Sequence, residues 1–318
     1  MTSKSNLTIH QLRVFDAIVR SGSITQAALA LNLPQPSVSR LISRLEREIG
    51  VPMFDRFSTG MALTTAGVHF HENAVNAIHF HDRAIDDARA STGLLIGNIS
   101  IAAPDSVGGV LFAPLVQGMR DDHDGVRLRT IVSQSTEIPR MLAAGSIDIG
   151  IVADTHPTPA QAAFALFRED LYLIGLKSAK LLQQSEVSLA ETAGIPLVLN
   201  ALPGGFRSLI DHGFASLDIT PNVQIEIDAN NAMLELLAQG AGFSILPYSI
   251  ITQLRARESL AAVRIVNPNL TRTLSMITAT NKPMTAVMRE TVRRIQLVIR
   301  EKAAQAHWRP VRDQTRVD

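Results

Sequence analysis

Three short helical patterns separated by tight turns occupy residues 9–50, and they constrain the fold of this part of the chain more than any other feature. Residues 9–21 repeat apolar side chains with a helical period and end at Ser21-Gly22. Ser23-Ile24-Thr25-Gln26 has the spacing of a capping box, so a second helix is expected from there through Leu31. Asn32-Leu33-Pro34 breaks that helix after a few turns.

The third helical pattern has two faces of opposite chemistry. Pro36 suits the first turn of a helix and Gly50 its end. The apolar face is Val38, Leu41, Ile42, Leu45 and Ile49, and the polar face is Gln35, Ser37, Ser39, Arg40, Ser43, Arg44 and Arg47. Arginine pairs with guanine and an amide with adenine, while hydroxyl and guanidinium groups also bind phosphate. By itself the polar face fits a solvated surface, but after a short helix and tight turn it fits a recognition helix.

Charge and composition narrow the classes of protein further. The chain has a net charge of +1, yet residues 1–65 hold seven basic and four acidic side chains, which is typical of a polyanion partner at one end. Its 318 residues suggest about two domains. The absence of cysteine excludes disulfide scaffolds, thiolate metal sites and cysteine nucleophiles. Residues 1–7 do not resemble a signal peptide and no apolar run suits a spanning helix, so we expect a cytoplasmic protein with no membrane partner.

The N-terminal segments strongly resemble LysR-type transcriptional regulators. The matching motifs include Ser21-Gly22-Ser23-Ile24-Thr25-Gln26-Ala27-Ala28, Gln35-Pro36-Ser37-Val38-Ser39-Arg40, Leu45-Glu46-Arg47-Glu48-Ile49-Gly50, Phe54-Asp55-Arg56 and Leu63-Thr64-Thr65-Ala66-Gly67. The resemblance implies a winged helix-turn-helix over residues 7–65, whose wing runs from Phe54 to Leu63. Many family members carry further basic residues just after the position of Arg56, whereas this chain does not, so its wing contacts are expected to be weaker.

The expected partner of this domain is double-stranded promoter or operator DNA. The resemblance implies that Arg56 reaches the DNA backbone or the minor groove. The expected DNA contacts are Thr25, Gln35, Pro36, Ser37, Ser39, Arg40, Arg44 and Arg56.

Residues 66–91 form a connector with a long helical pattern. Its apolar or small side chains recur in steps of three and four, so they form one apolar stripe along the helix that can pack against another helix. The resemblance implies a linker helix that pairs two subunits, whereas the alternative is packing against its own chain. A dimer holds two recognition helices at half-sites about 34 Å or more apart, and the family generally forms dimers of dimers. Four histidines lie here without an i, i+4 pair, so no metal is expected: His69, His71, His79 and His81.

Strand and helix patterns alternate after Ser91-Thr92-Gly93, which is expected to be a hinge. Alternation with short connections indicates an α/β fold with a parallel sheet. Residues 142–151 and 237–247 resemble the effector-binding half of the LysR family, which is similar to periplasmic binding proteins. That resemblance implies an effector-binding domain over residues 92–300, with lobe I at 92–169 and 270–300, lobe II at 170–269, and crossings near 168–171 and 266–273. Residues 270–274 weakly resemble the nitrogen-assimilation-control branch, and a flexible tail is expected over 301–318.

The resemblance also implies an effector cleft between the lobes. The expected contacts are Pro104, Asp105, Ser106, Gln134, Ser135, Thr136, Asn200, Pro203, Phe206, Asp228 and Asn230. Helix starts are expected near Asp105 and at residues 133–136, where free N–H groups suit a polar or anionic metabolite. Serine and threonine at such places can equally be simple caps. Asp105 is either a cap or a partner for an amino group of the effector.

Two other classes of protein remain to be weighed. A solute-binding protein of a transport system also has an α/β cleft, but it needs an export signal and has no use for a basic helical unit. An enzyme is not expected, because the chain lacks a G-x-S-x-G elbow, a glycine-rich phosphate loop with lysine and an H-E-x-x-H helix. We therefore expect an effector-controlled regulator that needs no cofactor and that contacts RNA polymerase.

Overall fold

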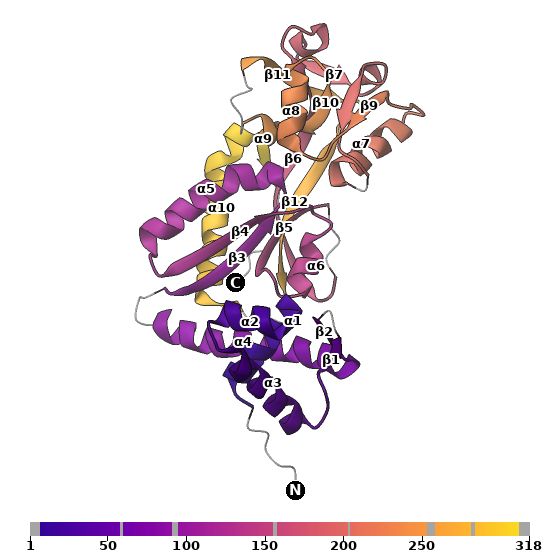
Figure 1. Cartoon of the computed structure of the whole chain (residues 1–318). Coiled ribbons are helices and arrows are strands. Elements are labelled where there is room, and N and C mark those ends of the chain that lie inside the picture. The colour runs from indigo at the N-terminus through magenta and orange to yellow at the C-terminus, as the bar shows by residue number, and fades with distance from the viewer. Residues whose placement is uncertain are drawn as a thin grey trace. The chain divides into compact units, whose positions relative to one another are not determined.

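The computed structural model describes residues 7–57, 60–90, 95–154, 158–202, 204–252, 258–280 and 284–311 (Figure 1). The chain divides into two compact units, Met1–Gly93 with Asn281–Ala286, and Leu94–Thr280 with Val287–Asp318. The expected hinge at residues 91–93 lies outside the described residues, and each unit is described by itself. Within the described parts of the chain, no helix is long and apolar enough to cross a membrane.

The first unit begins with the three expected helices, α1 (Ile9–Ser21), α2 (Ile24–Leu31) and α3 (Gln35–Ile49). Gly22 and Gly50 end α1 and α3 with positive φ angles of 66° and 87°, a conformation that glycine adopts without a steric cost. The small side chains Ala27 and Ala28 of α2 are buried, so this helix can pack closely on its neighbours. Local residue chemistry thus accounts for both the helices and their ends.

The expected capping box at the start of α2 does not form. Ser23 has the extended backbone of an N-cap, but its side chain makes no capping hydrogen bond. The reciprocal pair lies one helix earlier, where the Thr8 hydroxyl accepts from the Gln11 N–H and the Gln11 side chain accepts from the Thr8 N–H. Thr8 and Gln11 have the same spacing as Ser23 and Gln26, so the pattern alone did not distinguish the two helices.

Phe15 lies at the centre of the hydrophobic core of the first unit. Its fully buried ring is 5.1 Å from that of Phe54 and 5.2 Å from that of Phe70, measured between centroids. Phe54 begins the antiparallel hairpin of β1 (Phe54–Phe57) and β2 (Gly60–Leu63), and Phe70 lies on α4 (Thr65–Ala90). One core therefore joins the three helices, the wing and the first turns of the long helix, which confirms the predicted winged helix-turn-helix.

The second unit is built on a mixed sheet with the strand order β4-β3-β5-β12-β6-β11-β7. In its first lobe, β4 and β5 both run parallel to β3, whereas β12 is antiparallel to β5. Strands and helices alternate here, as the sequence predicts, but the antiparallel β12 makes the sheet mixed and not parallel as expected. The elements of this lobe are β3 (Gly97–Ala103), α5 (Asp105–Asp122), β4 (Val126–Val132), α6 (Ile138–Ala143), β5 (Ile149–Ala153), β12 (Thr271–Ala279) and α10 (Ala286–Ala306).

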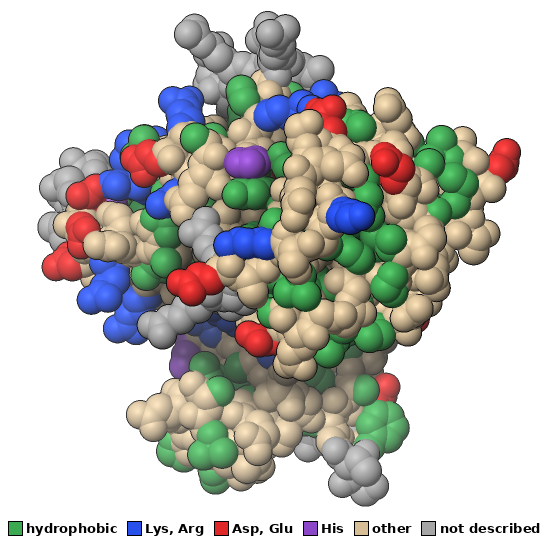
Figure 2. All heavy atoms as spheres, turned by 90° about the horizontal axis from the view of Figure 1, so that it is seen from above, with side chains coloured by type: hydrophobic (Ala, Val, Ile, Leu, Met, Phe, Trp, Pro, Cys, Tyr) green, Lys and Arg blue, Asp and Glu red, His purple; other side chains and the backbone are tan. Residues whose placement is uncertain are grey.

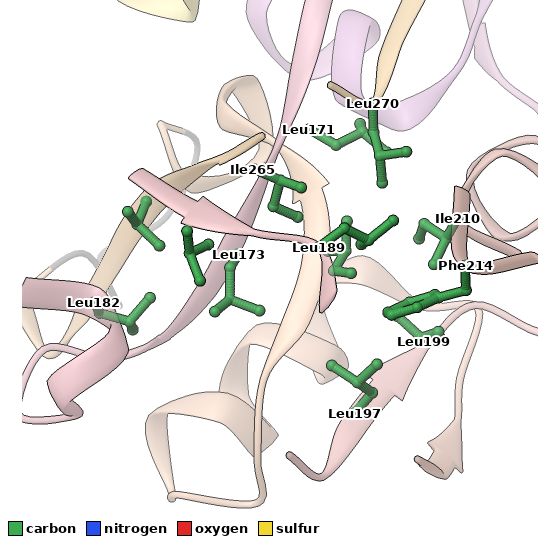
Figure 3. Packing of buried hydrophobic residues seen from close by; sticks show 13 residues of the cluster. Leu171, Leu173, Leu182, Leu189, Leu197, Leu199, Ile210, Phe214, Ile265 and Leu270 are labelled. Carbon is green, nitrogen blue, oxygen red and sulfur yellow. The ribbon is translucent and has the colours of Figure 1, made fainter. Parts of the chain in front are cut away.

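The second lobe has its own hydrophobic core. Figure 3 shows Phe214 and Ile210 beside Leu199, and all three side chains are almost completely buried. Basic and acidic side chains lie intermixed on the face seen from above in Figure 2. The elements of this lobe are η1 (Lys180–Gln183), β7 (Glu186–Ser188), η2 (Ala190–Thr192), β8 (Leu197–Leu199), α7 (Gly205–Ala215), β9 (Val223–Glu226), α8 (Asn230–Ala238), β10 (Ser244–Pro247), α9 (Tyr248–Ile251) and β11 (Leu260–Val266).

The strand β6 (Gln161–Leu176) runs through both lobes. It pairs with β12 as far as Asp170, and from Leu171 onward it pairs with β10 and β11. The chain returns to the first lobe between β11, which ends at Val266, and β12. Both changes fall inside the stretches that were expected to cross, so the first lobe is assembled from two separate parts of the sequence.

The expectation of a flexible tail from residue 301 is wrong as far as residue 311. Helix α10 continues to Ala306, and β13 (Trp308–Pro310) then pairs antiparallel with β6. Trp308 is only 4% exposed, because its ring stacks on Phe167. One large apolar side chain therefore anchors a segment of polar appearance, while residues 312–318 lie outside the described chain.

A buried ion pair joins the two crossing strands. Arg272 of β12 donates to Glu169 of β6 with an Nε–Oε1 distance of 2.6 Å, and both side chains are at least 97% buried. The Trp308 indole N–H and the Ser249 hydroxyl also donate to Glu169, at 3.0 and 3.4 Å. Burial makes such a pair costly unless its remaining hydrogen-bonding groups are satisfied, and these neighbours provide that compensation.

Removing one partner of this pair should destabilise the second unit strongly. We predict that Arg272→Met lowers the free energy of unfolding by about 3–5 kcal/mol, because it leaves the Glu169 carboxylate buried without its counter-charge. Adding Glu169→Gln should recover part of that loss. Urea unfolding can be followed by the fluorescence of Trp308, the only tryptophan of the chain. Arg140→Met is the control, because the Arg140 side chain is 80% exposed; equal effects of the two single substitutions would contradict the prediction.

Candidate functional site

Helix α3 presents a polar surface on the side opposite its buried residues. Val38, Ile42 and Leu45 face the core. Five of the expected DNA-contacting residues are exposed and two are half-buried, and they lie on α2 and α3. The exposed ones are Thr25, Gln35, Pro36, Arg40 and Arg44, and the half-buried ones are Ser37 and Ser39.

For Arg56, the contact expected from the wing, the structure describes the backbone alone. Arg56 pairs with Met61 in the β1–β2 hairpin, but its side chain lies outside what the structure describes. Glu46 on α3, which the sequence analysis did not single out for a role, accepts hydrogen bonds from the N–H groups of Met53 and Phe54 at 2.9 and 3.3 Å. This carboxylate therefore holds the end of α3 against the start of the wing. Its only sequence signal is the Leu45-Glu46-Arg47-Glu48 motif.

The arginines of α3 make only weak local contacts. Arg44 lies 3.0 Å from Glu48 one turn later, and its side chain is 63% exposed. The Nε atom of Arg40 donates to the carbonyl of Pro36 at 3.3 Å. Exposed pairs of this kind contribute little to stability, so both guanidinium groups can exchange these contacts for others.

A polar cluster joins α1 to α4. Asp16 contacts His71 at 2.9 Å and Arg20 at 2.8 Å. Burial acts to raise the pKa of Asp16, but the hydrogen bond with His71 and the charge of Arg20 outweigh it, so the pKa is lowered. His71 is thus a structural partner of Asp16, and the described residues contain no group of three histidine or acidic side chains suited to hold a metal ion.

In the second unit, the starts of α5 and α8 meet where the two lobes come together. The Asn230 side-chain amide donates to Asp105 at 2.8 Å, although the two residues are 125 positions apart. Asn230 is 9% exposed, and its amide oxygen is buried without a hydrogen-bond partner. Two of the expected effector residues are thereby brought into direct contact across the lobes.

Ser106 and Phe206 contact the arginine of the buried ion pair. The Ser106 hydroxyl accepts from Arg272 at 2.8 Å, and Ser106 is only 1% exposed. The guanidinium carbon of Arg272 lies 4.0 Å from the centre of the Phe206 ring, within range of a cation–π interaction. Pro104 is buried as the N-cap of α5. Ser106 of the first lobe and Phe206 of the second lobe are therefore linked through Arg272, which sequence spacing does not reveal.

The helix start expected at residues 133–136 is displaced. These residues form the end of a loop and a turn, and α6 begins only at Ile138. Pro139 fits the first turn of a helix, which explains the later start. The Ser135 hydroxyl accepts from the Ala153 N–H at 3.1 Å, while Gln134 and Thr136 are exposed.

The remaining expected effector residues lie in the second lobe. Asn200 donates to the carbonyl of Ile227 at 3.2 Å, and Asp228 accepts from the Ala201 N–H at 3.0 Å. Pro203 lies outside the described residues. Arg207 is nearby, but it is engaged with Asp211, Glu226 and the carbonyl of Asn200. Burial acts to lower the pKa of Arg207, but the bonds to Glu226 and Asp211 raise it overall.

The charges at this junction are largely balanced within the protein. Arg272 is paired with Glu169, and Arg207 is paired with two carboxylates. Asp105 adds a carboxylate, and the amide oxygen of Asn230 adds an acceptor without a partner. This junction therefore offers hydrogen-bond acceptors at least as readily as donors.

Both units match described protein families. Residues 9–68 match the family "Bacterial regulatory helix-turn-helix protein, lysR family", and residues 92–298 match the "LysR substrate binding domain". The chain is 29% identical over 243 residues to the HTH-type transcriptional activator CmpR of Synechocystis sp., covering 76% of this chain and 79% of that protein. It is 26% identical over 271 residues to the nitrogen assimilation regulatory protein nac of Klebsiella aerogenes, covering 85% and 88%.

Solved structures of the same fold cover nearly the whole chain. A full-length OxyR variant from Pseudomonas aeruginosa has a TM-score of 0.77 at 19% identity, covering 98% of this chain and 99% of that one. Full-length CbnR complexed with its target DNA has a TM-score of 0.62 at 23% identity, covering 92% and 100%. Together with the two family matches, these likenesses lead to one conclusion: the chain belongs to the LysR family and is a LysR-type DNA-binding transcriptional regulator with an effector-binding domain.

Proposed function

We propose that this regulator reads its operator through the exposed face of α3, with Arg40 and Arg44 as the principal contacts. The observation that carries this proposal is that both guanidinium groups lie on the exposed side of a helix whose other side is fixed in the core. Arginine binds the O6 and N7 atoms of guanine or a phosphate, and Gln35 suits adenine. Contacts to the DNA backbone come from Thr25 on α2 and from Pro36, Ser37 and Ser39 on α3. Arg56 supplies the contact of the wing.

The long helix α4 supports dimerisation of the regulator. It carries three large apolar side chains that are exposed within one chain, namely Val68 at 46%, Phe80 at 56% and Ile85 at 38%. A second α4 would cover such residues, which favours a second copy over packing on the same chain. Two paired helices would hold the recognition helices at half-sites about 34 Å or more apart. We expect dimers to assemble into tetramers that contact RNA polymerase in the cytoplasm.

The effector is proposed to be a small polar or anionic metabolite that binds where α5 and α8 meet. The contact between Asp105 and Asn230 supports this position, because it joins the lobes and leaves one buried acceptor without a partner. On this proposal, further contacts come from Gln134, Ser135 and Thr136 of the first lobe and from Asn200, Phe206 and Asp228 of the second. Pro203 is also an expected contact, but it lies outside the described residues. An effector that binds one arrangement of the subunits more tightly than another would shift the population between them.

The first test concerns the recognition helix. Arg40→Ala should reduce specific operator affinity by about tenfold or more, because a good arginine contact contributes about 1–3 kcal/mol. Binding to DNA from upstream of the gene and to scrambled DNA can be measured by fluorescence anisotropy at two salt concentrations. Loss of specificity indicates a base contact, whereas a uniform loss with a smaller salt dependence indicates a phosphate contact.

Arg140→Ala is the matched control, because it removes one exposed positive charge from the other unit. A folded Arg40→Ala protein with unchanged affinity would remove Arg40 from the interface. Failure of the wild-type chain to bind any DNA would overturn the operator-reading proposal itself.

The second test separates two roles of Asp105. If its carboxylate binds an amino group of the effector, Asp105→Asn should weaken the response to amine-containing metabolites by about tenfold or more and change that to carboxylic acids little. The N-cap of α5 is Pro104, so the alternative is that Asp105 only accepts from Asn230 and complements the dipole of the helix. In that case the substitution should lower the thermal stability slightly and leave effector selectivity unchanged. The readout is operator affinity in the presence of a panel of metabolites of both kinds.

A further inference from the structure

The last described residues of the chain form a third strand beside the crossing. In β13, Trp308, Arg309 and Pro310 lie opposite Glu169, Arg168 and Phe167 of β6. These same residues of β6 pair with β12 along the other edge. Among the described strands, β13 is therefore the second partner of β6 immediately before it passes into the other lobe. Crossing strands paired on both edges resist bending more than a strand paired on one edge.

On the first-lobe side, Trp308 fixes this segment. Its ring stacks on Phe167 with a centroid distance of 4.1 Å and an interplanar angle of 20°. Its indole N–H donates to Glu169 at 3.0 Å, so the segment also completes the shell of the buried ion pair. The preceding helix α10 is held to α5 by Arg294, which pairs with Asp122.

On the second-lobe side, His307 makes the contacts. Its ring stacks on that of Tyr248, the first residue of α9, with a centroid distance of 3.7 Å and an interplanar angle of 2°. Its Nδ1 atom lies 3.0 Å from the hydroxyl of Tyr172, which is on the second-lobe part of β6. Partial burial lowers the pKa of His307, which favours the neutral ring at neutral pH.

An ion pair lies between these two anchors. Arg309 contacts Asp170, the last residue of β6 that pairs with β12. Asp170 also accepts from Thr271 at 2.6 Å and from Arg264 at 3.2 Å, so it connects both crossing segments. Three consecutive residues, His307, Trp308 and Arg309, therefore contact the second lobe, the first lobe and the crossing itself.

We propose that residues 307–309 are a built-in clamp that restrains the hinge between the two lobes. A change of lobe angle must bend β6 near residues 167–171. Residues 307–309 oppose this, because β13 pairs with β6 on the first-lobe side of the bend while His307 stacks on Tyr248 on the other side. The clamp must open before the angle can change. This inference concerns the second unit alone, so it holds whether or not the chain binds DNA and whatever its effector is.

The test compares two shortened chains. One ends at Ala306 and lacks the clamp, and the other ends at Val311 and lacks only residues 312–318. Hydrogen exchange at residues 166–172 and 266–272, measured by mass spectrometry, should be about tenfold faster or more in the first chain than in the full-length protein. The second chain should match the full-length protein.

Residues 149–153 of the buried strand β5 separate a looser hinge from a general loss of stability. Their exchange should stay unchanged in the chain that ends at Ala306, and an equal acceleration there would overturn the proposal. Unchanged exchange at the crossing would overturn it as well. Point substitutions provide a second route if the shortened chain fails to fold. His307→Ala and Trp308→Phe should each accelerate exchange at the crossing by a smaller factor than the truncation does.

The lack of cysteine allows a direct measurement of the lobe angle. Arg127→Cys in β4 and Ser185→Cys before β7 place one spin label on an exposed position in each lobe. The distribution of distances between the labels should be narrow in the chain that ends at Val311 and clearly broader in the chain that ends at Ala306. Equal widths would show that residues 307–309 do not restrain the lobes.

Discussion

The effector-binding domain depends on how its two crossing strands hold a pair of buried charges. Glu169 and Arg272 face each other on neighbouring strands, and both are shielded from solvent. Their remaining hydrogen bonds come from Ser106 in the first lobe, Ser249 in the second and Trp308 near the C-terminus. Since an incompletely satisfied buried pair is strongly destabilising, these distant segments must come together for the domain to be stable.

The sequence predicted the DNA-binding unit well because its determinants are local. Val38, Ile42 and Leu45 lie on one face of α3, and Gly22 and Gly50 end their helices in the left-handed conformation, so the period and the end signals agree. Local reasoning fails where the same pattern occurs twice. Thr8-Gln11 and Ser23-Gln26 both have the spacing of a capping box, but only Thr8 and Gln11 form one. The prediction of a flexible tail is wrong for residues 301–311 for a different reason. Trp308 anchors this segment by stacking on Phe167, which lies far earlier in the sequence and which no local pattern connects to it.

The junction of the lobes could be predicted only in part. The start of α5 follows from its own sequence, but the contact between Asp105 and Asn230 depends on how two lobes close, which no local pattern records. Ser106 and Phe206 illustrate the same limit. Both are expected effector contacts, yet in the structure they contact Arg272, a residue to which no local sequence pattern assigns a role.

Arginine has two different uses in the two units, and composition alone cannot separate them. In the second unit Arg272 is buried and Arg207 is half-buried, and both are paired with carboxylates, so their charges are not available to a polyanion. In the first unit Arg40 and Arg44 are exposed and weakly engaged. A count of charges therefore does not separate arginines that are engaged within the fold from those that remain accessible. Pairing removes the charges of Arg207 and Arg272 from the reach of a polyanion, whereas the exposure of Arg40 and Arg44 keeps their charges accessible.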